Sequence, residues 1–159
     1  MKELTAGAQG ITEKRVIRAI YTVNIFMLVL TGFGQMPIYK RYYLSDIPGF
    51  SWLANFLTPR EIHYLVAGLL LALVAYIGRD YLILKRKNRK ITATGYVRIA
   101  LITGIIITGT LFVIKNFPPY IFSPNFIIFL NLSHLGFVMA FLLVSLYCVV
   151  VKKKWTTSR

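Results

Sequence analysis

The sequence predicts an all-α integral membrane protein, a bundle of four transmembrane helices with both termini in the cytoplasm. Of its 159 residues, 57% are hydrophobic and 15% are charged, and the mean hydropathy is +0.64. A soluble domain carries about 25% charged residues. Four segments offer the roughly 20 mainly apolar residues that a membrane-spanning helix needs. The length is that of one domain, so we expect a single membrane domain over residues 1–159.

The first span is expected at about residues 16–35 and the second at about 59–84. Behind Arg18 the first has no charge before Lys40, and it is too long for the apolar region of a signal peptide. The second begins at Thr58-Pro59-Arg60-Glu61, a capping box with proline at the first helical position. We therefore predict that this helix starts at Pro59.

The third span is expected at about residues 94–115 and the fourth at about 124–151. The third is uncharged over 99–114, and the fourth lies in an uncharged run over 116–151. Ser123-Pro124 is a cap followed by proline, so we predict that the fourth helix starts there. No internal repeat is evident along the chain.

The basic residues indicate the orientation. Fifteen lie at the two termini and in the middle loop, against four on the other side: Lys2, Lys14, Arg15, Arg18, Arg79, Lys85, Arg86, Lys87, Arg89, Lys90, Arg98, Lys152, Lys153, Lys154 and Arg159, against Lys40, Arg41, Arg60 and Lys115. Basic residues concentrate on the cytoplasmic side of membrane proteins, so both termini are expected there.

Two loops are expected to lie at the membrane surface. The run 85–90 of the middle loop should contact anionic lipid. The loop 38–57 is then extracytoplasmic, and its aromatic residues suit the headgroup zone as a short interfacial segment: Tyr39, Tyr42, Tyr43, Phe50, Trp52 and Phe56. The net charge of +14 is thus explained by basic residues at the boundary between membrane and water, and no nucleic-acid partner is expected.

The scarce cysteine and histidine residues restrict the chemistry. Cys148 is the single cysteine, which excludes a disulfide framework, a CxxC redox pair and a CxxCH covalent haem site. The two histidines, His63 and His134, would lie roughly 8 Å and 15 Å below the outer ends of the second and fourth helices. An ionisable residue within the bilayer is a candidate functional residue. Two at similar depth suggest one shared ligand.

A non-covalent b-type haem with His63 and His134 as its metal ligands fits this pair, since neutral imidazoles bind iron from both faces. Zinc fits less well because no carboxylate or thiolate lies near to complete its ligands. The other interpretation is that each imidazole only donates a hydrogen bond to a neighbouring helix.

Four more residues are candidates for binding the haem or a quinone. Ala67 and Gly68 are small enough to let a porphyrin approach, and Arg60 could pair with a haem propionate. Asn131, one turn before His134, could orient a ring or a quinone carbonyl. The alternatives are close helix packing for the small residues and Asn131, and a headgroup contact for Arg60.

Several short motifs occur in an order that resembles a known family, the four-helix cytochrome b membrane subunits of formate dehydrogenases and nickel–iron hydrogenases. The resemblance covers nearly the whole chain and rests on these segments: Arg18-Ala19-Ile20-Tyr21-Thr22, Leu30-Thr31-Gly32, His63-Tyr64-Leu65-Val66-Ala67-Gly68, Thr103-Gly104 or Thr108-Gly109, and His134.

Members of this family bind two haems, and the chain lacks the histidines that hold one of them. The family histidine of the first helix is Tyr21 here, and the second histidine of the fourth helix falls at Tyr147 or Cys148. The two haem levels would be about 21 Å apart along a helix. The resemblance therefore implies a single-haem relative, in which these three side chains or a quinone fill the other position; we favour the side chains.

The resemblance implies a haem b-containing membrane anchor in the cytoplasmic membrane of a bacterium or archaeon. Such a subunit passes electrons between the membrane quinone pool and an extracytoplasmic partner that holds iron–sulfur clusters or several haems. Within that oxidoreductase complex, the chain would be either non-catalytic or reactive with quinone. The competing class is a non-redox scaffold or assembly subunit without haem. A transporter is disfavoured because the five acidic residues all lie outside the spans or at their edges.

Overall fold

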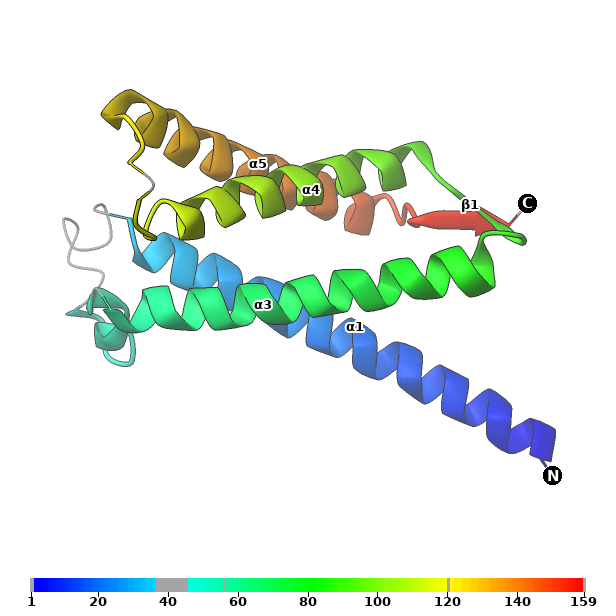
Figure 1. Ribbon diagram of the computed structural model, residues 1–159. Coiled ribbons are helices and arrows are strands. Elements are labelled where there is room, and N and C mark those ends of the chain that lie inside the picture. Colours follow the sequence, from blue (N-terminus) through cyan, green and yellow to red (C-terminus); the bar gives the residue numbers. More distant parts are fainter. Residues whose placement is uncertain (1, 37–45, 56, 120, 159) are drawn as a thin grey trace. The chain divides into compact units, whose positions relative to one another are not determined.

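The computed structural model describes residues 2–36, 46–55, 57–119 and 121–158. Within these ranges, four helices are long and apolar enough to cross a membrane (Figure 1). This confirms the prediction of an all-α chain with four membrane-spanning helices. The apolar spans agree with the predicted ones to within a few residues, but the first helix begins at Lys2, fourteen residues before its predicted start. The helices are α1 (Lys2–Gly34, apolar from Arg15), α3 (Leu57–Asp80, continued by the π-helical turn η3, Tyr81–Lys85), α4 (Ala93–Ile114) and α5 (Pro124–Val150).

The chain divides into two compact units, residues 1–80 and 81–159. Each unit is built on a helical hairpin: α1 packs along α3 in the first, and α4 packs along α5 in the second (Figure 1). Large apolar side chains cover the outer surfaces of both hairpins; Leu65 and Val149, for example, are each 74% exposed. Such a surface suits lipid as the surrounding solvent.

In the first unit, the 3₁₀-helix η2 (Ser51–Ala54) packs against the end of α1. Its Leu53 is buried, and a Cβ on Gly34 would lie only 3.1 Å from Leu53 Cδ2. Phe50 and Trp52 are exposed, as expected of an interfacial segment. The other aromatic residues predicted for this segment lie outside the described residues: Tyr39, Tyr42, Tyr43 and Phe56.

Helix α3 starts earlier than the capping box predicts. It begins at Leu57, whose backbone N–H donates to Asn55 Oδ1 (3.1 Å). Thr58 and Pro59 therefore lie inside the first turn, and the predicted start at Pro59 is wrong by two residues. Proline is tolerated there because the N–H groups of a first turn have no partner within the helix.

In the second unit, both helices begin at side-chain caps. Thr92 Oγ1 accepts a hydrogen bond from Gly95 N (3.0 Å) at the start of α4, and Ser123 Oγ accepts one from Phe126 N (3.3 Å) at the start of α5. The predicted helix start at Ser123-Pro124 is confirmed.

The second unit also contains a small sheet that the sequence did not predict. Strand β1 (Arg89–Ile91) pairs antiparallel with β2 (Thr156–Ser158), with Lys90 opposite Thr157. The sheet holds the C-terminal segment against the start of α4, since Thr92 N also donates to Trp155 O (3.1 Å).

Candidate functional site: two histidine–threonine pairs

His63 is held by a threonine of the neighbouring helix in the first unit. It lies six residues beyond the first residue of α3, about 9 Å along the helix. Its Nδ1 is 2.9 Å from Oγ1 of Thr31, a fully buried residue of α1. A Cβ on Gly32 would lie 3.4 Å from the Cε1 atom of His63, so the glycine lies against the imidazole edge.

His134 has the same surroundings in the second unit. It lies ten residues beyond the first residue of α5, about 15 Å along the helix. Its Nδ1 is 2.8 Å from Oγ1 of Thr108, a buried residue of α4, and a Cβ on Gly109 would lie 3.5 Å from its Cε1. The ring of Phe112 meets the imidazole edge-on, with centroids 5.5 Å apart.

The hydroxyl groups indicate which ring nitrogen carries the proton. Thr31 Oγ1 donates to Met27 O (2.7 Å), and Thr108 Oγ1 donates to Gly104 O (2.8 Å). A hydroxyl has one hydrogen, and these bonds to the preceding turn use it. Each Oγ1 therefore accepts from the Nδ1–H of its histidine. In a neutral imidazole of this tautomer, the lone pair of the ring lies on Nε2.

The two pairs form a structural repeat that was not recognised in the sequence. In each hairpin, a Thr-Gly dipeptide near the end of the first helix faces a histidine of the second helix. The spacing hides the repeat, because 32 residues separate threonine from histidine in the first unit and 26 in the second. The two threonines are the residues that the sequence interpretation missed as histidine partners, although the Thr-Gly dipeptides were visible.

The remaining candidates near His63 differ in position. Arg60 and Ala67 are half-buried and lie three residues before and four residues after His63, on the same side of α3. Gly68 is exposed, and a Cβ added to it would meet no atom within 4 Å. Helical geometry directs Gly68 away from the imidazole, and its role in letting a porphyrin approach stays a prediction.

On α5, Asn131 is exposed, although it lies only one turn before His134. The three residues at the family's other haem level differ in burial: Cys148 is buried, Tyr21 is half-buried and Tyr147 is exposed. Cys148 and Tyr21 therefore have the burial that a space-filling role needs, whereas Tyr147 does not.

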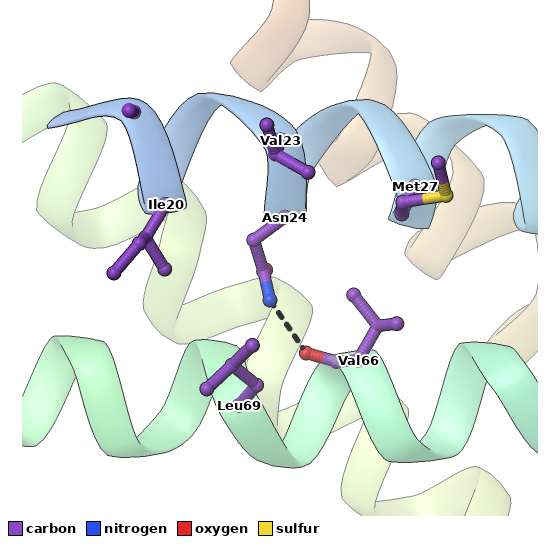
Figure 2. A pocket seen from close by; sticks show the side chains of 7 residues that line it. Ile20, Val23, Asn24, Met27, Val66 and Leu69 are labelled. Carbon is purple, nitrogen blue, oxygen red and sulfur yellow. Dashed lines mark hydrogen bonds between the residues drawn. The ribbon is translucent and has the colours of Figure 1, made fainter. Parts of the chain in front are cut away.

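A second polar position lies deeper between α1 and α3. Asn24 is 2% exposed, and its Nδ2 donates to Val66 O (3.0 Å) at the floor of a groove of about 370 Å³ (Figure 2). Asn24 Oδ1 has no hydrogen-bond partner among the described residues. The groove is otherwise apolar, with Ile20, Val23 and Leu69 among its lining.

His63 and His134 belong to different units, and their pairing stays a prediction. Among the described residues, no three His, Cys, Asp or Glu side chains lie close enough together to hold a metal ion. Comparison of the chain with protein-family models, curated proteins and solved structures found no match.

Proposed function

We propose that the chain is a haem b-containing membrane anchor and electron-transfer subunit, in which His63 and His134 would hold the iron of one haem. The observation that carries this proposal is the matched pair of histidine–threonine hydrogen bonds, 2.9 Å and 2.8 Å long. The only two imidazoles of the chain are held at Nδ1 in the same way, by buried threonines on separate hairpins.

The donor set fits a haem iron. A metal-ligating histidine typically donates its second ring N–H to a fixed acceptor, which sets the tautomer and the orientation of the ring. Thr31 and Thr108 supply that acceptor and leave the lone pair on Nε2. Gly32 and Gly109 place no side chain against the imidazole edges. An apolar helical surface around two neutral imidazoles suits an apolar macrocycle.

A bound haem would supply one-electron chemistry, and the chain would tune it. His63 and His134 would hold the iron, and the threonines would keep both rings oriented. Burial between helices lowers the surrounding dielectric, which together with the axial ligands adjusts the reduction potential. Arg60, one turn from His63, supplies a positive charge for a propionate.

The proposal includes a place in the cell and two partners. The distribution of basic residues favours a cytoplasmic membrane of a bacterium or archaeon with both termini inside. Both histidines would then lie toward the outer face, within reach of an extracytoplasmic subunit that holds iron–sulfur clusters or several haems. Membrane quinone would be the other electron carrier. In the groove at Asn24, the unpartnered Oδ1 could accept a hydrogen bond from the O–H of the quinol form, and the exposed Asn131 of α5 is a second polar candidate.

Purified protein tests the proposal. We expect sharp reduced-minus-oxidised visible bands of a bis-histidine haem b, which His63→Ala and His134→Ala should each abolish. Leu65→Ala and Leu132→Ala are matched controls, because they remove exposed side chains of the same two helices. Bands that persist in either histidine variant would refute the ligand assignment.

The same hydrogen bonds also favour a second candidate, a non-redox scaffold or assembly subunit. Each histidine–threonine bond links two helices and satisfies a polar group inside the membrane, which is sufficient reason for a histidine there. A colourless, haem-free protein that stays folded and joins its complex would support this function instead.

A further inference from the structure

Arg98 is a buried cation at the start of α4. It is 5% exposed, its Nε donates to Thr94 O (3.3 Å), and its guanidinium carbon lies 4.0 Å from the centre of the Trp155 ring. Arg98 Nη2 is sealed from solvent and has no hydrogen-bond partner within the part of the chain that the structure describes. The sequence interpretation counted this residue with the cytoplasmic bases. The third span predicted at residues 94–115 already includes it, and only its burial was not predicted.

The unit that contains Arg98 has no side chain that could neutralise it. No aspartate or glutamate follows Asp80 in the sequence, so the second unit carries only basic charged side chains. Arginine does not lose its proton in proteins, and a buried charge without a partner is costly. The guanidinium therefore has no carboxylate side chain within its own unit to pair with, and an anion from outside could fill that role.

The surroundings of Arg98 favour an anion. The dipole at the start of α4 favours negative charge, although Gly95 N is already bonded to the cap Thr92. The C-terminal segment is bound to this turn, because Thr92 Oγ1 donates to Lys154 O (2.8 Å) and Thr92 N donates to Trp155 O. A Cβ on Gly95 would lie 2.5 Å from Trp155 O, so glycine is required for this close approach.

We propose that Arg98, Trp155 and the first turn of α4 form a binding site for a phosphate group, carried by an anionic lipid or free in solution. The planar guanidinium matches two phosphate oxygens at once, and Nη2 would be one of its donors. Exposed basic residues next to the site, Arg89, Lys90 and Lys154, would attract the anion. Tryptophan is enriched at this boundary between lipid and water.

This site is independent of the proposed haem. Arg98 lies ten residues before Thr108 on α4, about 15 Å along the helix from the histidine pair of the same unit. Loss of haem binding would leave the phosphate proposal intact, and loss of phosphate binding would leave the haem proposal intact.

Native mass spectrometry of the full chain in detergent tests the lipid arm, with phosphatidylglycerol titrated against phosphatidylcholine. We expect about tenfold tighter retention of phosphatidylglycerol, which Arg98→Gln removes. Arg86→Gln is the matched control, because it removes the same charge from an exposed position of the middle loop. A melting curve in inorganic phosphate against chloride, at equal ionic strength, tests the free-anion arm.

The proposal is supported if the wild type prefers phosphatidylglycerol, or if phosphate raises its melting temperature, and if this effect is lost in Arg98→Gln but kept in Arg86→Gln. Which of the two effects is seen shows whether the phosphate comes from a lipid or from solution. Equal behaviour of wild type and Arg98→Gln would overturn it, as would a wild type that responds to neither. Should Arg98→Gln fail to fold, Arg98→Lys keeps the charge without the planar fork. Weaker binding in that variant supports the site, and unchanged binding overturns it.

Discussion

At the scale of single residues, the hydrogen bonds of Thr31 and Thr108 connect the sequence to the proposed chemistry. A threonine in a helix often bonds back to the preceding turn, and such a hydroxyl can then only accept from a second group. We infer that this second group is an imidazole N–H, so that two ordinary side chains favour the Nδ1–H tautomer of both histidines.

Replacing either threonine by valine should weaken haem binding about 10- to 100-fold, the usual effect of losing a partner that orients a metal ligand. Thr31→Val and Thr108→Val remove the acceptor and keep the shape. Thr22→Val and Thr110→Val are matched controls, because these exposed threonines make the same bond to the preceding turn. Haem titration of the four variants gives the comparison; equal affinities in all four would contradict the assigned role, and serine at 31 or 108 should restore binding.

The tautomer can be measured without haem. We expect the ¹⁵N spectrum of histidine-labelled, haem-free protein, recorded at a pH where the imidazoles are neutral, to show the proton of both rings on Nδ1, because Thr31 and Thr108 accept there. Thr31→Val should change the His63 signals alone, and Thr108→Val those of His134. A proton on Nε2 in the wild type would contradict the hydrogen-bond assignment.

The sequence identified the histidines but not their partners. His63 and His134 stand out because imidazoles are rare in membrane spans. Which threonine meets them depends on the rotation and register of two packed helices, and these follow from side-chain packing along the whole interface. Gly68 shows the same limitation: it is close to His63 in sequence, but the helical turn separates them.

At the scale of helices and strands, two glycines of α4 differ in how closely α5 approaches. A Cβ on Gly104 would lie 2.9 Å from the ring of Phe137, whereas one on Gly109 would lie 3.5 Å from His134 Cε1. Gly104 therefore determines the spacing of this hairpin, and Gly109 leaves room for a methyl group.

We therefore expect Gly104→Ala to destabilise the protein by about 1–3 kcal/mol through overpacking, and Gly109→Ala to change stability far less. The phenylalanine ring of Phe137 must move in the first variant, while the added methyl of the second makes ordinary contact. Unfolding of both variants in the same detergent measures the difference. Equal stability of the two variants would contradict the packing of α4 on α5.

Hydropathy predicted the four helices because each must present an apolar surface along its full length. Hydropathy could not predict the sheet, because its paired residues, such as Lys90 and Thr157, lie near opposite ends of the sequence of the second unit. The start of α3 was misjudged for a local reason: Asn55 Oδ1 accepts from Leu57 N and begins the helix before the capping box. Arg98 lies inside the predicted third span, but its burial was not predicted, because a basic side chain near the end of a span usually extends to the water boundary.

At the scale of the whole molecule, the repeat of a Thr-Gly and histidine pair in two hairpins is the main feature beyond the four helices. Each hairpin presents one imidazole in the same tautomer, as a symmetric bis-histidine ligand set requires. The single haem that we propose, with Tyr21, Tyr147 and Cys148 where further histidines would be needed for a second one, would leave no second carrier across the membrane.

Electron transfer through this chain alone should therefore move little or no charge across the membrane. One haem near one face cannot relay electrons to the other. Membrane-potential measurements on the complex reconstituted in vesicles would check this with His134→Ala as the haem-free control. A haem-dependent potential generated through this subunit would contradict the single-haem account.

The haem content of the purified wild-type chain tests the central claim most directly. Pyridine haemochrome analysis, combined with quantitation of the protein, gives the number of b-type haems per polypeptide. The account predicts one haem per chain. A folded, monodisperse chain that binds none when supplied with haem, or that binds two, would contradict it.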